Sequence, residues 1–265
     1  YATIDCFDVP GFNFDSEQGR TSAGRLIDKI RTVDMLVLVV RAFENPSVPA
    51  YKSRVDPAGD LEELRTELLL SDLELVSTRI ERLEKQAKKP SKKQAQDKAE
   101  LELQKKLQEA IEQENPISSA IETSAEREMI KSLNFLTLKP ILVAVNVGEN
   151  QLEEQIQLAC SAPDEAGVLQ ICAKLEQELS QLGTSSRVEF MEDLGIEQSA
   201  LSRFVQSCYS TLGLISFITV GDDEVRAWPI KKGTIAHDAA GKVHSDIKRG
   251  FIRAETFCYD DFKEY

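Results

Sequence analysis

Residues 141–145 read Ile-Leu-Val-Ala-Val, which is apolar at every position, and Pro140 precedes them. A strand with two apolar faces is typical of the centre of a parallel sheet that helices cover on both sides. Ligands of such sheets bind beyond the carboxyl ends of the strands. The pattern therefore predicts a buried parallel strand whose following loop, residues 146–149 (Asn-Val-Gly-Glu), contacts a ligand.

Two further apolar segments are predicted strands with short loops at their ends. Residues 2–7 lead into the loop 8–11 (Asp-Val-Pro-Gly), and residues 168–171 lead into the turn 172–174 (Cys-Ala-Lys). Taken alone, these loops have ordinary alternatives, a Gly-containing loop in the centre and a Pro-Gly turn at the amino end. Three such loops in this order, each after an apolar strand, favour a nucleotide site that all three form together.

Between residues 60 and 112 the apolar residues recur at three-and-four spacing, which predicts two antiparallel helices. The first stripe, which contains one slip, is Leu61, Leu64, Leu68, Leu73, Val76, Ile80 and Leu83, and the second is Leu103, Leu107 and Ile111. Asp60 is the expected N-cap of the first helix, and Asn115-Pro116 ends the hairpin.

Lysines gather where this hairpin turns, around Pro90-Ser91. They are Lys85, Lys88, Lys89, Lys92, Lys93 and Lys98. A solvated turn between charged helices is one interpretation. The other is that the tip binds the phosphates of an RNA, where each neutralised phosphate adds a salt-dependent increment to affinity.

After residue 213 short alternating segments replace the helical pattern. Residues 215–220 and 225–228 predict a β-hairpin with Trp228 in its core, and residues 251–257 predict another strand. Helices are expected over residues 234–243 and, further upstream, near 124–133, over 175–182 and within 193–212.

Composition is that of a globular protein of roughly two domains, with 265 residues, 42% hydrophobic and 29% charged. No apolar run approaches the roughly 20 residues that cross a bilayer. Five scattered cysteines without a CxxC pair favour reduced thiols in the cytoplasm. A formal net charge of -13 argues against nucleic acid except at the hairpin tip. His237 and His244 lack zinc-site spacing and are interpreted as surface or packing residues.

The loop after the central strand has side chains suited to an adenine. Guanine-binding proteins of this arrangement carry NKxD here, and this chain has Val147 and Glu149 in the Lys and Asp positions. A carboxylate only accepts hydrogen bonds, so Glu149 can accept from the amino group of adenine, while Asn146 can donate and accept. At the amino end the DxxG pattern fits an Asp8 that holds magnesium through water and a Gly11 whose N–H meets the terminal phosphate.

The chain resembles the Obg-like ATPases of the YchF type along nearly all of its length. The segments that carry the resemblance are DVPGF at the start, IRTVDMLVLVVRAFEN (30–45), DLEELRTELLLSDLELVSTRIERLEKQAK (60–88), SLNFLTLKPILVAVNVGEN (132–150), VEFMEDLGIEQSALSR (188–203), EVRAWPI (224–230) and VHSDIKRGFIRAE (243–255). The resemblance implies an α/β fold, with a P-loop NTPase-like parallel sheet, incomplete at its N-terminal part, an inserted antiparallel helical hairpin and a C-terminal ubiquitin-like β-grasp (TGS) domain. It assigns residues 1–55 and 134–212 to the nucleotide-binding domain, 56–133 to the helical coiled-coil insertion and 213–265 to the TGS domain.

The same resemblance implies a nucleoside triphosphatase that prefers ATP to GTP, uses Mg2+ and works in the cytoplasm with the ribosome, at its large subunit or ribosomal RNA. It implies neither DNA nor a membrane as partner, and it offers the TGS domain as a surface for a protein. In this reading Asn146, Val147 and Glu149 contact the adenine, and Cys172, Ala173 and Lys174 pack against the base or ribose.

The sequence departs from the family in two respects. It contains no GxxxxGK[ST], the loop that cradles the phosphates, so we expect the first strand, that loop, the first helix and the first switch to lie upstream, and one or two strands to follow Tyr265. Residues 1–265 alone should therefore bind nucleotide weakly and be inactive.

Only Gly19 and Gly24 interrupt residues 12–25, where the family is Gly-rich. This second departure favours an alternative class, a non-catalytic scaffold that binds partners through the hairpin and the TGS domain.

Overall fold

The structure is a computed structural model that describes residues 3–11, 17–87, 93–152, 154, 156, 158, 165–221, 224–258 and 261, with the backbone alone for 17–23, 87, 165 and 166. The chain divides into two compact units. One comprises Asp8–Ser207, and the other comprises Tyr1–Phe7 together with Cys208–Tyr265.

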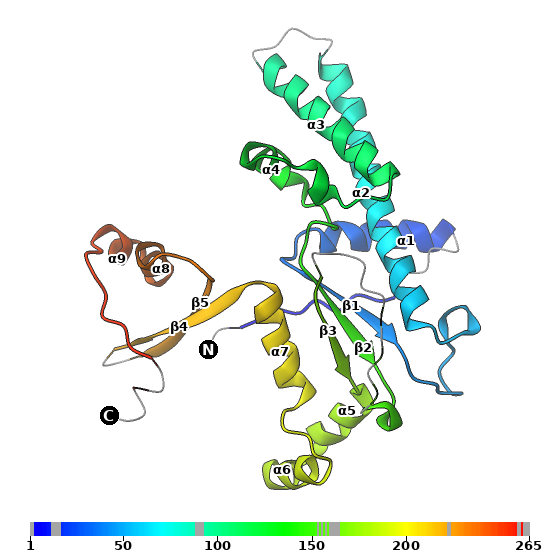
Figure 1. The fold of residues 1–265 in the computed structure, drawn as a ribbon, viewed down its shortest axis with the longest axis vertical. Coiled ribbons are helices and arrows are strands. Elements are labelled where there is room, and N and C mark those ends of the chain that lie inside the picture. Colours follow the sequence, from blue (N-terminus) through cyan, green and yellow to red (C-terminus); the bar gives the residue numbers. More distant parts are fainter. Residues whose placement is uncertain are drawn as a thin grey trace. The chain divides into compact units, whose positions relative to one another are not determined.

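The first unit contains a parallel sheet of three strands in the order β1-β2-β3 (Figure 1). The strands are β1 (Leu36–Arg41), β2 (Ile141–Asn146) and β3 (Glu165–Ile171). In register, Arg41 lies beside Asn146 and Asn146 beside Ile171, so the carboxyl ends of all three strands lie level. The central position of β2 and its four buried inner residues, 142–145, confirm the predicted buried strand.

Helices α1 (Glu17–Ile30), α5 (Ala173–Gln181) and α6 (Thr184–Asp193) belong to the first unit. Helix α7 (Ala200–Thr211) begins in the first unit and ends in the second. The core of the sheet combines residues from several of these elements: Ile30, Leu36, Leu38, Val40, Leu61, Leu68, Val143, Val145, Leu175 and Leu179. The predicted helices over 175–182 and within 193–212 correspond to α5 and α7, whereas α6 was not predicted.

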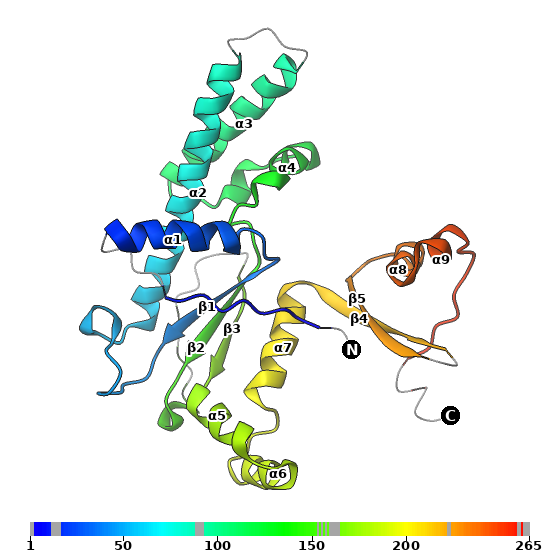
Figure 2. The same cartoon turned by 180° about the vertical axis from the view of Figure 1, so that it is seen from behind.

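A long helical hairpin is inserted between β1 and β2 (Figure 2). It consists of α2 (Pro57–Ala87) and α3 (Gln94–Glu112), which run side by side. The amino-terminal part of α2 packs on the sheet through Leu61 and Leu68. The carboxyl-terminal part packs on α3 through a separate cluster that includes Val76, Ile80, Leu103, Leu107 and Ile111, as the stripes predicted. Residues 88–92, which hold several of the lysines of the predicted basic tip, lie outside the described residues.

The start of α2 differs from the prediction, because Asp60 is not its N-cap. The helix begins at Pro57, and Asp56 Oδ1 accepts a hydrogen bond from Gly59 N at 3.0 Å. Proline suits the first helical position, where no intrahelical N–H is needed, so the helix starts a turn earlier. Asp60 lies in the first turn and forms an ion pair of 2.9 Å with Arg54.

Short helical turns complete the first unit. They are η1 (Tyr51–Ser53), η2 (Ile117–Ala120), α4 (Ser124–Ile130), η3 (Lys131–Leu133) and η4 (Glu149–Gln151). Together α4 and η3 confirm the short amphipathic helix predicted near 124–133. Thr123 and Glu126 form a capping box at the start of α4, in which each side chain binds the other residue's backbone N–H.

The second unit contains the antiparallel pair β4 (Leu214–Val220) and β5 (Val225–Lys231), followed by α8 (Ala236–Val243) and α9 (Ser245–Arg249). These confirm the predicted hairpin and helical connection. Trp228 is only partly buried, so its prediction as a core residue was wrong. Its Nε1 donates to Thr219 Oγ1 at 2.9 Å, and the Arg226 guanidinium lies 4.3 Å from its ring centroid. The ring is therefore held on the surface of the hairpin by polar and cation–π contacts.

Two predicted strands are not strands. Residues 3–7 and 251–257 pair with no other strand among the described residues. Apolar alternation is not sufficient, because a strand requires a hydrogen-bonded neighbour. Phe7 is 76% exposed and Ile252 is 92% exposed, so these apolar side chains are not packed into a core. No helix within the described part of the chain is both long and apolar enough to cross a membrane.

Candidate functional site

A cavity of about 1100 Å³ lies at the carboxyl ends of β1 and β2 and at the start of α5. Its lining comes from four segments, which are the loop after β1, the start of α2, the loop after β2 and the β3–α5 turn. The lining residues used below are Phe43, Glu44, Asn45, Asn146, Val147, Gly148, Glu149, Cys172, Ala173 and Lys174. This is the edge at which parallel α/β sheets bind their ligands.

Asn146 connects the end of β2 to the β3–α5 turn by a hydrogen bond. As the last residue of β2, it places its Oδ1 3.1 Å from Ala173 N, which donates the hydrogen bond at the start of α5. The acceptor of the side chain is therefore engaged by the protein. Its amide nitrogen forms no hydrogen bond with the described residues, so it has two N–H groups to donate to a ligand.

Glu149 and Lys174 form an ion pair across the mouth of the cavity, with 3.1 Å between Oε1 and Nζ. This hydrogen bond raises the pKa of Lys174, with smaller contributions from the charges of Glu149 and Glu178. The side chains are 46% and 67% exposed, respectively. Exposed ion pairs contribute little to stability, so Glu149 can exchange this contact for a ligand at low cost.

Val147 and Cys172 form the buried floor of the site. They are 2% and 3% exposed, and both belong to the core beneath the sheet. The Val147 N–H donates to Ile171 O at 2.8 Å, which continues the β2–β3 ladder by one residue. Val147 therefore packs mainly into the protein, and the polar residues Asn146 and Glu149 line the cavity beside it.

Gly148 leaves room for two polar side chains of the loop. A Cβ at this position would lie 2.7 Å from Asn150 Oδ1 and 3.3 Å from Gln151 Oε1. The Gly148 N–H also donates to Gln151 Oε1 at 3.0 Å. Any other residue would therefore displace these side chains or the backbone that carries Glu149.

The loop after β1 supplies residues that the sequence did not identify. Arg41 donates to the carbonyls of Phe43 and Val48 at 2.8 and 3.0 Å, and its guanidinium lies 4.5 Å from the Phe43 ring centroid. These contacts hold Glu44 and Asn45 at the cavity. The signal was present in the sequence, because these residues follow an apolar strand just as Asn146 does.

The two residues that were predicted to contact the phosphates and Mg2+ do not line this cavity. Asp8 and Gly11 are exposed, and neither belongs to the lining of the cavity. Between them, Val9 packs against the sheet core, and together with residues that include Ile27 and Leu36 it lines a small apolar pocket. Of the predicted site residues, the structure therefore brings together the six on the base side and leaves these two apart.

Other reactive side chains do not converge. Within the described ranges, no group of three or more His, Cys, Asp and Glu residues could hold a metal ion. His244 Nδ1 accepts from Asp246 N at 3.1 Å, which caps α9, and the His237 ring lies 6.1 Å from that of Phe251. Both histidines are surface or packing residues, as predicted. Cys6 and Cys258 are exposed, whereas Cys172 and Cys208 are buried.

The sheet, the inserted hairpin and the cavity at the strand ends define an α/β protein of the P-loop NTPase-like class. Comparisons with known proteins agree. Two relatives named "Ribosome-binding ATPase YchF" are 38% identical over 261 residues in Bacillus subtilis (strain 168) and 36% identical over 267 residues in Haemophilus influenzae. These alignments cover 96% and 99% of this chain, and 70% and 73% of the relatives.

The chain belongs to the YchF family. The family model YchF-GTPase_C, described as a protein of unknown function (DUF933), matches residues 214–265. The solved structure of the Schizosaccharomyces pombe YchF GTPase superposes with a TM-score of 0.75 at 29% identity. That superposition covers 90% of this chain and 66% of the solved one, so the chain spans slightly under two thirds of that relative.

Proposed function

We propose that the chain is part of an ATP-binding and hydrolysing switch protein that acts with the ribosome in the cytoplasm. The observation that carries the proposal is the cavity at the carboxyl end of β2, where Asn146, Glu149 and Lys174 lie around one opening. Membership of the YchF family supports the same conclusion, because the curated relatives bear the name of ribosome-binding ATPases.

The polar groups of the cavity fit the edge of an adenine. Adenine presents the N6 amino group as a donor and N7 as an acceptor on one edge. Glu149 supplies an acceptor for the amino group, and the Asn146 amide supplies a donor for the ring nitrogen. Cys172 and Ala173 provide an apolar surface beside them, and the Lys174 stem extends it to the ribose. Guanine offers an oxygen where adenine has the amino group, so a carboxylate in this place disfavours GTP.

The phosphates and Mg2+ belong on the side of Asp8 and Gly11. Mg2+ in nucleotide sites is held by one or two side chains, water and phosphate oxygens, so a cluster of carboxylates is not required. Asp8 is exposed and suits an outer contact to the ion through water. Gly11 is exposed, and a residue without a side chain lets a phosphate approach its backbone N–H. Bound Mg2+ would neutralise charge that develops on the phosphates during transfer.

A non-catalytic scaffold is the second candidate. The low glycine content of residues 12–25 favours it, because few residues there reach positive φ without strain. Release of phosphate from ATP by the intact protein distinguishes the two classes. Turnover supports the enzyme, and ribosome binding without turnover supports the scaffold.

Base specificity tests the proposed site directly. We expect Glu149→Asp to shorten the acceptor arm, weaken the contact with adenine and lower the preference for ATP over GTP by about tenfold, the equivalent of one hydrogen bond. Adding Val147→Lys should favour GTP further, but it places a charge at a position that is 2% exposed, so it also costs folding free energy. The single variant is therefore measured first, by isothermal titration calorimetry of both nucleotides with the intact protein.

Glu178→Asp is the matched control. Glu178 also lies near Lys174, at 3.9 Å, but it does not line the cavity. The control should leave the ratio of the two affinities unchanged. Equal ratios for wild type, Glu149→Asp and the control would refute the assignment of Glu149 to the base.

A further inference from the structure

The slip in the apolar stripe of α2 has a structural cause. The stripe runs through Leu61 and Leu68 to Val76 and Ile80, and the position four residues after Leu68 is occupied by Asp72. This carboxylate is 0% exposed, so a charge lies in the middle of the buried face of the helix. It falls between the part of α2 that packs on the sheet and the part that packs on α3.

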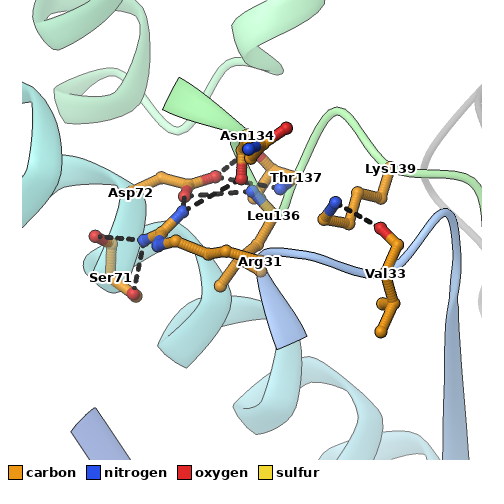
Figure 3. A network of polar contacts seen from close by, with 8 residues as sticks. All are labelled: Arg31, Val33, Ser71, Asp72, Asn134, Leu136, Thr137 and Lys139. Carbon is orange, nitrogen blue, oxygen red and sulfur yellow. Dashed lines mark hydrogen bonds and ion pairs between the residues drawn. The ribbon is translucent and has the colours of Figure 1, made fainter. Parts of the chain in front are cut away.

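Asp72 is fully engaged in hydrogen bonds (Figure 3). It accepts from Arg31 Nη1 at 2.7 Å, from Leu136 N at 3.1 Å, and from Thr137 N and Oγ1 at 2.9 and 2.8 Å. The carboxylate thereby binds two consecutive backbone N–H groups of the turn that leads into β2. A charged acceptor with four fixed donors permits one geometry, whereas apolar contacts alone allow sliding.

Arg31 completes the network from the other side. It directly follows α1, and its N–H still bonds to Ile27 O at 3.0 Å. Its guanidinium also donates to Ser71 O and Ser71 Oγ at 3.0 and 2.8 Å and to Asn134 O at 3.3 Å. Three segments that are distant in sequence, the end of α1, the middle of α2 and the turn before β2, therefore meet at one buried ion pair (Figure 3).

A second hydrogen bond connects the region after α1 to the turn before β2. Lys139 Nζ donates to Val33 O at 2.6 Å, so the loop after α1 is also bound to the turn before β2. Burial lowers the pKa of Lys139, against the opposing charge of Asp34. At its amino-terminal end the hairpin packs on the sheet through the apolar side chains of Leu61 and Leu68.

We propose that the Arg31–Asp72 pair is a joint that couples the position of α1 to that of the helical hairpin. Through it, a displacement of the end of α1 shifts the middle of α2 and the turn 134–137 together. The functional use of the joint rests on the proposed function, because α1 follows the segment of Asp8 and Gly11 in the chain. In that setting the joint makes the hairpin respond to the state of the phosphate side.

The joint is tested first without nucleotide, by amide hydrogen exchange of the intact protein with mass spectrometry. Arg31→Met removes the charge and the donors while keeping the length of the side chain. We expect exchange to rise about tenfold or more at residues 27–31 and also across the joint, at 69–76 and 133–138. A rise confined to residues 27–31 would overturn the proposal.

Arg79→Met is the matched control. Arg79 also belongs to α2 and pairs with Glu100 of α3 through two hydrogen bonds of 2.7 and 3.0 Å. Its loss should affect α2 and α3 within the hairpin and leave residues 27–31 and 133–138 unchanged. If Arg31→Met does not fold, Arg31→Lys and Thr137→Val give the same comparison with smaller expected changes, because each removes only part of the network.

Addition of ATP and Mg2+ then separates the joint from the proposed function. In wild type we expect ATP to change exchange at residues 144–151, in α1 and at 69–76. Arg31→Met should retain the first two changes and lose the third. No change at residues 144–151 would contradict the proposed function while the nucleotide-free comparison still decides the joint. Retention of the change at 69–76 in Arg31→Met would overturn the joint itself.

Discussion

Removal of the Asp72 carboxylate should strongly destabilise the first unit. In Asp72→Ala, the Arg31 guanidinium, which is 13% exposed, loses its counter-charge, and the N–H groups of Leu136 and Thr137 lose their acceptor. The substitution also leaves the hydroxyl of Thr137 without its partner. The effect therefore comes from several buried groups that remain unsatisfied, more than from the attraction of the pair itself.

The expected size follows from these contacts. Breaking a buried ion pair by removing one partner costs about 3–5 kcal/mol, because the other charge stays buried. Arg31 retains its bonds to Ser71 and some access to water, so the lower end applies. We expect a loss of about 3 kcal/mol in the free energy of unfolding, which is a large fraction of the roughly 5–15 kcal/mol of a typical domain.

Urea unfolding of the intact protein, followed by circular dichroism, measures this loss as a lower midpoint at unchanged slope. Glu74→Ala is the control, because Glu74 lies on the exposed face of the same helix two residues away. It should change the free energy of unfolding by less than about 0.5 kcal/mol. If Asp72→Ala also stays within about 1 kcal/mol of wild type, the network does not hold the hairpin to the sheet.

Three further predictions concern other parts of the first unit. Gly148→Ala should weaken ATP binding in calorimetry while the urea midpoint stays near that of wild type, because the new Cβ would meet Asn150 Oδ1 at 2.7 Å; unchanged affinity would contradict this role of the loop. Gly24→Ala should stabilise α1 by about 0.5–1 kcal/mol, since its Cβ meets open space, and a lower urea midpoint would show that the glycine is needed. The N–H groups of Glu122 and Thr123 hold the pKa of Glu126 below its ordinary value. The stability from this cap is complete above the ordinary value and is lost as pH falls through the lowered one, so protection factors in α4 should fall only in acid; constant protection there would exclude the cap as their source.

The parts of the fold that the sequence predicted are those with a strong hydrophobic pattern. Residues 141–145 are apolar throughout and form the central strand, and the two stripes of the hairpin pack as expected. The parts that it did not predict depend on tertiary partners. Residues 2–7 and 251–257 have apolar alternation, but a strand is decided by its neighbours, and none is present among the described residues.

The candidate site shows the same division. The order of the loops after the strands brought Asn146, Glu149 and Lys174 to one cavity, because parallel strands end at one edge. The burial of Val147 could not be read from a loop position, since it depends on the core beneath. Likewise, Asp72 was visible in the sequence only as a slip in a stripe. Its role in the network depends on Arg31 and the turn 134–137, which are 41 and more residues away in the sequence.

The proposed function depends on hydrogen bonds between the base of ATP and the side chains of Asn146 and Glu149. The most direct measurement is a crystal structure of the intact protein with Mg2+ and a non-hydrolysable ATP analogue. We expect the Glu149 carboxylate at about 3 Å from the amino group of adenine, with the Asn146 amide at a ring nitrogen. An adenine bound elsewhere, or one that leaves Glu149 paired with Lys174 and out of reach of the base, would contradict it.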